Sequence, residues 1–520
     1  MTKRGNVHPT KLKAAKLLKI EGRRYRAHMQ SLEDLVGPPK LIEECGVFGI
    51  IGAENNDAAA LTALGLHALQ HRGQEAAGIA TFDGEQFHSE RQLGLVSENF
   101  SDVETLGRLK GNAAIGHTRY STQGDTVLRN VQPLYADLDR TGIAVAHNGN
   151  LTNAKTMRAD LVRRGCIFQS TSDSEIFLQL TARSQYLSAT DKLIESLKQV
   201  EGAYALTVLT PEGLIGARDP VGIRPLILGE LNGAHILASE TCALDIIGAK
   251  FVRDVEPGEV VICRNDGTID TRQISPNPTN ARPCIFELIY FARPNSIVDG
   301  DSVYQLRKRL GKHLAKEAPC EADLVSPIPD SGVPAAIGYA ETANLPYEMA
   351  LIRSHFIGRT FIEPQQKIRE AGVARKHSPN RGVIDGKRVL LIDDSIVRGT
   401  TSRKIAEMLR KAGATEIHLR IACPPIVHPD FYGINTPSYE ELIAVEQSVE
   451  EMRESIGVDS LAFLSLNGLY KAFRKKRRDD LAPAFTDHCF TGDYPTRLTD
   501  RDASARDAMI TQLSFLAESS

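Results

Sequence analysis

The chain has 520 residues, of which 42% are hydrophobic and 24% are charged, a composition typical of a soluble globular protein with about two to four domains. Its formal net charge of −3 argues against nucleic acid as the main partner, because no overall positive field would attract a phosphate backbone. No apolar stretch approaches the ~18 residues that span a bilayer, and no secretory signal is evident, so we expect no membrane-bound or secreted protein.

The eight cysteines are scattered and form no CxxC pair, which disfavours a zinc site and a disulfide framework. They are Cys45, Cys166, Cys242, Cys263, Cys284, Cys320, Cys423 and Cys489. Most are predicted to be small buried residues of a protein in the reducing cytoplasm. Cys45 is the exception.

Residues 1–44 form a basic extension, in which a run of Lys and Arg residues is followed by Gly37, Pro38 and Pro39. A disordered extension, an amphipathic arm around residues 12–20 and a targeting peptide are the alternatives. Transit peptides are usually rich in serine, and this arm is not. We prefer an extension that is removed or left loose.

Residues 45–280 are predicted to form one domain of short strands with a few helices. Strand-like runs occur at residues 46–51, 113–118, 143–147, 203–209 and 260–263, and amphipathic helices at residues 58–70 and 174–187. This mixture favours an α+β domain of layered, antiparallel sheets. The proline-containing residues 276–283 are interpreted as a linker.

In residues 281–480, strands and helices alternate, which predicts an α/β domain with a mostly parallel sheet. Strands are expected at residues 324–327, 347–352, 389–392 and 416–422, and helices at residues 333–341 and 402–411. The charge run KAFRKKRRDD at residues 471–480 is typical of a solvated helix end. Residues 481–520 are expected to be a polar C-terminal tail.

Cys45 directly precedes a strand-like run, where a buried structural cysteine is the common case. Four polar clusters change this interpretation because each lies at the end of a predicted strand or helix. They occupy residues 71–75, 116–121, 147–150 and 172–175. Taken singly, Asn148-Gly149 is a common hairpin turn, Asp173 a common helix cap, and Arg119 an ordinary surface charge.

Residues 389–402, VLLIDDSIVRGTTS, combine a buried-strand pattern with a polar turn and a helix start. The strand ends in two adjacent carboxylates, Asp393 and Asp394, which can accept hydrogen bonds from a sugar diol or help to hold Mg²⁺. Gly399 then precedes a helix whose first N–H groups could bind a phosphate. The alternative is an ordinary strand-to-helix turn with two capping acids.

In order and type, the four polar clusters resemble the glutaminase domain of the class II, N-terminal-nucleophile glutamine amidotransferases. The resemblance implies that cleavage before Cys45 frees its α-amino group, which has a pKa of about 8 and can act as general base for the thiol. It also implies that Asn148 and Gly149 donate to the oxyanion. Arg119 would bind the α-carboxylate of glutamine, and Asp173 its α-ammonium group.

Residues 389–402 resemble the signature of type I phosphoribosyltransferases, whose ligand is phosphoribosyl pyrophosphate (PRPP), and lack the Gly-Lys-Ser/Thr ending of a Walker loop. The implied PRPP-binding residues are Asp393, Asp394, Arg398, Gly399, Thr400, Thr401, Ser402 and, in a catalytic loop, Arg359. Arg353 is a further candidate for binding the pyrophosphate, with a solvated surface position as its alternative. The resemblance implies Mg²⁺ near Ser331, Asp393 and Asp394.

Together the two halves resemble the glutamine PRPP amidotransferases over residues 44–496. That resemblance implies the first committed step of purine (IMP) biosynthesis: ammonia released from glutamine is transferred to PRPP, giving 5-phosphoribosylamine, glutamate and pyrophosphate. It further implies an internal ammonia channel, purine nucleotide feedback inhibitors and a homo-oligomer, expected to be a tetramer. The alternatives are an amidotransferase with another acceptor, such as a sugar phosphate, and a non-catalytic PRPP-sensing regulator.

Some members of that family carry a [4Fe–4S] cluster on four cysteines. Cys284 and Cys489 match two of those positions, and Asp430 and Thr486 occupy the other two. Because two thiolates cannot supply a four-cysteine site, no Fe–S cluster is expected.

Overall fold

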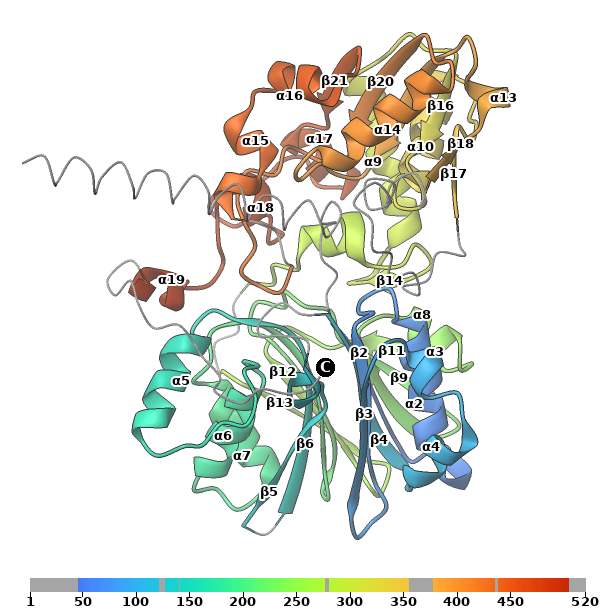
Figure 1. Cartoon of the computed structure of the whole chain (residues 1–520). Coiled ribbons are helices and arrows are strands. Elements are labelled where there is room, and N and C mark those ends of the chain that lie inside the picture. Colours follow the sequence, from blue (N-terminus) through green and yellow to red (C-terminus); the bar gives the residue numbers. More distant parts are fainter. Residues whose placement is uncertain are drawn as a thin grey trace, which may run out of the picture.

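The computed structural model describes residues 45–120, 127–139, 141–275, 280–354, 377–434 and 438–504. These residues form two parts, one built on two antiparallel sheets and the other on a parallel sheet, as Figure 1 shows in its lower and upper halves. Within these ranges, no helix is both long and apolar enough to cross a membrane. Arg359 and most of its expected catalytic loop lie outside the described residues.

The first part is a sandwich of two sheets in which every pair of neighbouring strands is antiparallel. The seven-stranded sheet has the order β11 (Lys250–Asp254), β9 (Ile227–Leu231), β10 (Ala234–Ala238), β1 (Gly46–Ile51), β4 (Ala113–Arg119), β2 (Ala76–Phe82) and β3 (Phe87–Leu93). The six-stranded sheet has the order β13 (Ile269–Gln273), β12 (Glu259–Arg264), β8 (Gly213–Arg218), β7 (Gly202–Thr210), β6 (Thr141–Leu151) and β5 (Leu134–Leu138).

Helices cover the outer face of each sheet, so the first part has four layers (Figure 1). One set comprises α2 (Ala58–Ala68), α3 (Val96–Asn99), α4 (Val103–Arg108) and α8 (Cys242–Asp245), and the other α5 (Ala154–Arg163), α6 (Glu175–Arg183) and α7 (Ala189–Leu197). The central strands β1 and β7 are buried along their whole length, because sheets pack on one face and helices on the other. These strands are accordingly apolar without alternation.

The second part contains a four-stranded parallel sheet in the order β16 (Leu324–Pro327), β19 (Arg388–Asp393), β20 (Glu416–Ile421) and β21 (Ser460–Phe463). Its main helices are α9 (Val303–Glu317), α10 (Val333–Ala343), α14 (Thr400–Lys411), α16 (Val449–Ile456) and α17 (Leu466–Ala472). Parallel strands need crossover connections, and α10, α14 and α16 lie in the three connections between consecutive strands of this sheet. The α+β and α/β fold classes expected from the sequence are confirmed.

Short elements join the two parts and cover their ends. They are the π-helix η3 (Glu287–Phe291), the paired strands β14 (Ile297–Val298) and β15 (Asp301–Ser302), the paired strands β17 (Leu351–Arg353) and β18 (His377–Pro379), and the helices α13 (Arg381–Ile384), α15 (Ile443–Glu446), α18 (His488–Thr491) and α19 (Thr499–Ser504). Single 3₁₀ turns are η1 (Glu54–Asn56), η2 (Leu128–Asn130) and η4 (Tyr439–Glu441). The segment that ends in α19 returns to the first part, where it contacts α5.

Several element boundaries differ from expectation, among them those of β6, which was expected at residues 143–147 and extends over Thr141–Leu151. The helices expected at residues 58–70 and 174–187 are α2 and α6, and both end earlier than their apolar patterns suggest. The strand expected at residues 347–352 is divided into an isolated bridge at Tyr347 and the short strand β17. Apolar spacing continues past a helix end whenever the following turn is also packed, so the pattern overestimates the length.

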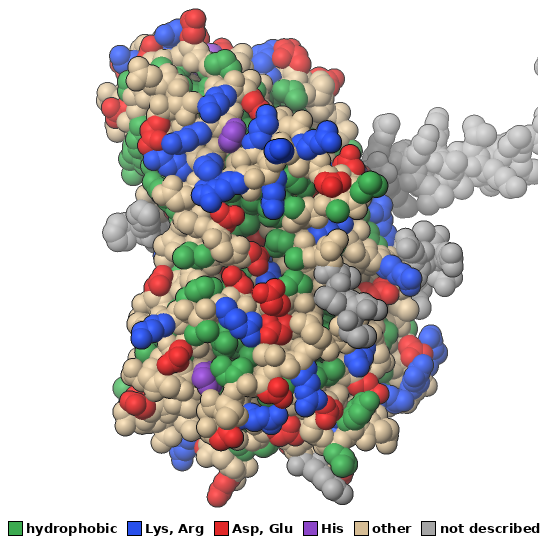
Figure 2. All heavy atoms as spheres, turned by 180° about the vertical axis from the view of Figure 1, so that it is seen from behind, with side chains coloured by type: hydrophobic (Ala, Val, Ile, Leu, Met, Phe, Trp, Pro, Cys, Tyr) green, Lys and Arg blue, Asp and Glu red, His purple; other side chains and the backbone are tan. Residues whose placement is uncertain are grey.

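The surface charge is not spread evenly, although the net charge is small. On the face seen in Figure 2, Lys and Arg side chains gather over the upper half, which belongs to the second part, and acidic side chains are grouped near the middle. Basic side chains gathered on this face of the second part favour the binding of small anionic ligands there.

Candidate active sites

Cys45 lies immediately before β1 and is 8% exposed. Its thiol donates to the carbonyl oxygen of Tyr120 at 3.5 Å. Burial raises the pKa of the Cys45 thiol, while the nearby guanidinium of Arg119 acts to lower it and the carboxylate of Asp173 to raise it. The structure therefore brings Arg119 and Asp173 to the thiol. A buried thiol of raised pKa needs a base to become a nucleophile.

The Asn148 side chain is 1% exposed on β6, and neither atom of its amide has a hydrogen-bond partner among the described residues. The next residue, Gly149, has a φ of 140°, and a Cβ there would lie 2.1 Å from the carbonyl oxygen of Ala203 on β7. Only glycine fits this position. A hairpin turn is excluded for Asn148-Gly149, since both residues lie within β6, paired to β7.

Asp173 and Arg119 are both buried, so neither is a surface charge. Asp173 accepts a hydrogen bond from the backbone N–H of Leu151 at 3.0 Å, which fixes it beside the strand that carries Asn148. Its carboxylate lies 3.9 Å from Nδ1 of His147. Burial lowers the pKa of His147, and Asp173 only partly opposes this effect. A neutral imidazole leaves the Asp173 charge available to a cationic substrate group.

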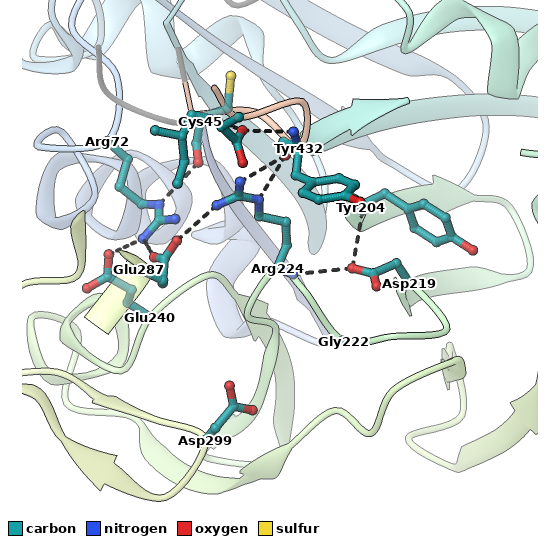
Figure 3. Close-up of polar contacts among 12 residues, drawn as sticks. Cys45, Arg72, Tyr204, Asp219, Gly222, Arg224, Glu240, Glu287, Asp299 and Tyr432 are labelled. Carbon is teal, nitrogen blue, oxygen red and sulfur yellow. Dashed lines mark hydrogen bonds and ion pairs between the residues drawn. The ribbon is translucent and has the colours of Figure 1, made fainter. Parts of the chain in front are cut away.

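Arg72, Glu240 and Glu287 are functional candidates that sequence reasoning missed (Figure 3). Nε of Arg72 donates to the carbonyl oxygen of Cys45 at 3.1 Å, and its Nη1 donates to both carboxylates. Burial acts to lower the pKa of Arg72, but Glu287 and Glu240 outweigh it and the pKa is raised. The sequence feature that could have revealed this cluster is Glu287, a carboxylate inside an apolar run. A carboxylate buried in such a run needs a cationic partner.

The second site lies where β19 meets α14. Asp393 and Asp394 end the strand and are buried, and the N–H of Asp394 donates to the Asp393 carboxylate at 3.0 Å. Gly399, with a φ of 73°, precedes the first residue of α14. Of the hydroxyl residues expected to bind PRPP, Thr400 and Thr401 are half-buried and Ser402 is buried in the first turn.

The turn after β16 lies beside the end of β19. Pro327 is paired with Ile392, and a Cβ on Gly332 would come within 2.4 Å of the Ile392 carbonyl oxygen. Ser331 belongs to this turn, so Ser331 and the acid pair, which were expected near Mg²⁺, share the carboxyl edge of the sheet. Ligands of doubly wound sheets bind at this edge.

Two arginines expected at the phosphates are ion-paired with protein carboxylates. Arg353, at the end of β17, pairs with Asp330 and is 41% exposed, and Arg398 pairs with Glu441. A third, Arg307 of α9, was not foreseen: burial lowers its pKa to about 10, which Asp394 opposes. A buried cation near Asp394 offsets part of the charge of the acid pair.

The described residues contain no group of three or more His, Cys, Asp or Glu side chains that could hold a metal by themselves. This arrangement fits Mg²⁺ on a phosphorylated ligand, because Mg²⁺ keeps waters and takes one or two carboxylates together with phosphate oxygens. Asp393 and Asp394 would supply the carboxylates, and Ser331 a hydroxyl.

The four positions considered for an Fe–S cluster lie near one another. Cys284 forms an isolated backbone β-bridge with Thr486. The negative charge of Asp430 acts to raise the pKa of both the Cys284 and the Cys489 thiol. Asp430 pairs with His488 at 2.8 Å. That no cluster is bound stays a prediction, which iron analysis of the purified protein would test.

Both parts match known protein families. Residues 117–245 match the family model of a glutamine amidotransferase domain, and residues 295–426 match that of a phosphoribosyl transferase domain. A solved structure of 48% sequence identity, described as the allosteric regulatory enzyme of purine biosynthesis, superposes with a TM-score of 0.83 and covers 87% of this chain and 97% of its own. The glutamine PRPP amidotransferase of Bacillus subtilis, complexed with ADP and GMP, has a TM-score of 0.82 at 48% identity, covering 87% of this chain and 98% of that one.

Whole-chain relatives agree with the domain matches. The amidophosphoribosyltransferase of Rhizobium etli is 56% identical over 496 residues, which are 95% of this chain and 99% of that protein. The amidophosphoribosyltransferase of Bacillus subtilis is 50% identical over 88% of this chain and 95% of its own length. The chain therefore belongs to the amidophosphoribosyltransferase family.

Proposed function

We propose that this chain hydrolyses glutamine at Cys45 and transfers the released ammonia to C1 of PRPP, the first step of purine biosynthesis. The products are 5-phosphoribosylamine, glutamate and pyrophosphate. The observation that carries the proposal is the unpartnered Asn148 amide beside Gly149, in the site that also gathers Cys45, Arg119 and Asp173. Buried amides normally find partners, so an amide without one in the protein indicates a ligand.

In the first reaction, the Cys45 sulfur attacks the side-chain amide carbon of glutamine. The α-amino group of Cys45, freed by cleavage after residue 44, takes the thiol proton and passes it to the leaving nitrogen. The Asn148 amide and the Gly149 N–H donate to the oxyanion. Ammonia departs, and water hydrolyses the thioester to glutamate and the free thiol.

Two charged residues orient the substrate in this reaction. The Arg119 guanidinium offers a planar pair of donors to the α-carboxylate of glutamine, and Asp173 accepts from its α-ammonium group. Both are buried, which strengthens these ion pairs relative to water. Together they select an amino acid over a simple amide.

In the second reaction, Asp393 and Asp394 accept hydrogen bonds from the ribose hydroxyls, while the turn holding Ser331 and the start of α14 donate to the phosphates. Asp393, Asp394 and Ser331 would hold Mg²⁺, which would supply positive charge to stabilise the departing pyrophosphate. The nitrogen lone pair of ammonia then forms the bond to C1 as the C1–O bond breaks. Ammonia must arrive unprotonated, which requires a passage that excludes water.

Regulation by purine nucleotides is part of the proposal, supported by the Bacillus subtilis relative that was solved with ADP and GMP. Inhibition of the PRPP-dependent rate by added purine nucleotides would test it. The homo-oligomer expected from the sequence stays a prediction, which the molecular mass in solution would decide.

The substitution Cys45→Ala tests the two-reaction scheme. Glutamine-dependent synthesis should disappear because the nucleophile is lost, while synthesis from added ammonia should continue because the second site is separate. The measurement is 5-phosphoribosylamine formation with each nitrogen source. Loss of both rates in a folded variant would contradict the scheme, and an unchanged glutamine-dependent rate would contradict the role of Cys45.

A further inference from the structure

Four buried charged side chains connect Cys45 with the second part of the molecule (Figure 3). The four are two arginines and two glutamates with almost no exposed surface: Arg72, Arg224, Glu240 and Glu287. Their charges sum to zero, and Glu287 contacts both arginines. Because a buried charge without its partner is strongly destabilising, each of the four fixes the position of its neighbours.

Arg72 fixes the backbone at the nucleophile. Its Nε donates to the Cys45 carbonyl oxygen at 3.1 Å, while Glu240 and Glu287 hold Nη1. Glu240 belongs to the first part, and Glu287 starts the π-helix η3 beyond the linker. Holding the carbonyl group of Cys45 restricts its backbone dihedrals, and these set where the thiol and the proposed basic amine point.

Arg224 continues the connection on the other side of Glu287. Its Nη1 donates to the second oxygen of Glu287 at 3.3 Å, and Nε and Nη2 donate to the carbonyl oxygen of Tyr432 at 3.0 and 2.9 Å. The same segment is held by Asp430, which accepts from the N–H groups of Tyr432 and Ile434 at 2.8 and 2.7 Å. Residues 430–434 are thus anchored at both ends.

Residues 430–434 lie against the proposed oxyanion strand. Nδ2 of Asn150 donates to the carbonyl oxygen of Phe431 at 2.9 Å. Gly433 has a φ of 121°, and a Cβ on it would lie 3.2 Å from the carbonyl carbon of Gly149. The backbone around Gly149 is therefore supported by a segment of the second part.

We propose that Glu287 is a positioning residue for glutamine hydrolysis, because it holds both the Cys45 carbonyl, through Arg72, and the segment behind Gly149, through Arg224. The proposal rests on the proposed function of the Cys45 site. Nucleophile and oxyanion donors come from different sheets, so one carboxylate from outside the first part fixes their relative position. Displacement by ~1 Å can lower the rate of a reaction by about 100-fold.

A purely structural connection between the two parts offers the matched control. Arg218 of β8 is buried and pairs with Asp299, which follows β14, at 2.9 Å. In Figure 3, Asp299 lies well away from Cys45. Asp299→Asn therefore removes an ion pair between the same two parts while both ion pairs of Glu287 keep their partners; Arg218 still donates to the carbonyl oxygen of Arg224 at 2.7 Å.

The experiment compares Glu287→Gln, Glu287→Asp and Asp299→Asn in the full, N-terminally processed enzyme. Glu287→Gln should lower kcat with glutamine by about 100-fold while the KM for glutamine and the ammonia-dependent rate stay near wild type. Glu287→Asp keeps the charge and should restore part of that loss. Asp299→Asn should leave the ratio of the glutamine-dependent to the ammonia-dependent rate unchanged.

Wild-type kcat with glutamine in Glu287→Gln would overturn the proposal, as would an equal loss of the glutamine-dependent and ammonia-dependent rates. If Glu287→Gln does not fold, the glutamine-dependent and ammonia-dependent rates of Glu287→Asp test the proposal instead. Failure of both variants to fold would show that Glu287 has a structural role only, and would overturn the proposal. Cys45→Ala separates this outcome from failure of the proposed function, because it tests the nucleophile without altering the four charges.

Discussion

At the scale of single residues, the site keeps polar groups that folding alone would not favour. The amide of Asn148 is buried with no partner among the described residues, and an unsatisfied buried polar group costs about 1–3 kcal/mol. Gln132, a nearby buried amide, is instead bonded to Ser174 Oγ at 3.0 Å and to the His147 N–H at 2.7 Å. The two amides therefore differ: Gln132 is satisfied within the fold, and Asn148 is the amide that we propose binds the substrate.

Asn148→Ala should therefore mainly lower the rate of catalysis, and Gln132→Ala should mainly lower the stability of the fold. Asn148→Ala should lower kcat with glutamine about 10²- to 10³-fold, because an oxyanion donor is lost, with little change in the free energy of unfolding. Gln132→Ala should mainly lower the free energy of unfolding, by about 1–3 kcal/mol. Steady-state kinetics and urea unfolding measure both; a larger loss of stability in Asn148→Ala would refute the assignment.

His117 gives the fold a predicted dependence on pH. Burial lowers its pKa to about 3, with Arg119 adding to the effect, while its Nε2 lies 3.1 Å from the carbonyl oxygen of His147. The unfolded state therefore binds more protons between the ordinary histidine pKa of about 6.5 and pH 3. Stability should fall as the pH falls through this window. Urea unfolding should show a smaller decrease in His117→Gln, and an identical pH profile would contradict this role.

At the scale of secondary structure elements, each site includes residues at the end of a strand: Cys45 precedes β1, and Asp393 ends β19. The residues proposed to bind PRPP lie at the carboxyl edge of the parallel sheet, where β19 is followed by Gly399 and α14. A Cβ on Gly399 would approach Cδ1 of Ile443 to 2.7 Å. This turn therefore depends on glycine for its left-handed backbone, whereas the end of the Ile443 side chain could move aside.

Gly399→Ala can be compared with Gly386→Ala, because Gly386 has a similar φ of 70° but open space around its Cβ. Each substitution should cost about 1–2 kcal/mol through the left-handed backbone. Only Gly399→Ala should also raise the KM for PRPP, because the strained residue directly precedes the helix start that is proposed to bind the phosphates. Initial rates with saturating ammonia measure this KM, and equal values in the two variants would contradict the assignment of the turn.

At the scale of the whole molecule, the contacts between the two parts include the buried charges around Glu287, the Arg218–Asp299 pair and the segment that ends in α19. In the last of these, the Asp500 carboxylate accepts from the N–H groups of Lys155 and Thr156 at 2.7 and 2.9 Å. It thereby caps the start of α5, distant in sequence.

Asp500→Ala should lower the free energy of unfolding by about 1 kcal/mol, as should loss of the cap of α4 in Asp102→Ala. Only Asp500→Ala should also release the segment containing α19, because Asp500 bonds that segment to the distant helix α5. Asp102 caps α4, the helix that directly follows Asp102 in the sequence. Limited proteolysis followed by mass spectrometry would show this difference. Equal cleavage of both variants near residues 497–504 would refute the docking role.

The sequence by itself determined the fold classes, most strand positions and the residues with recognisable chemistry, because apolar patterning and turn chemistry are local. β1 and β16 lie where the apolar runs at residues 46–51 and 324–327 predict them. Only the tertiary structure decided which charges face one another. Glu287 and Arg72 are more than 200 positions apart in the sequence. No local sequence pattern encodes this ion pair, because it forms only where the two parts of the molecule pack against each other and bury both charges.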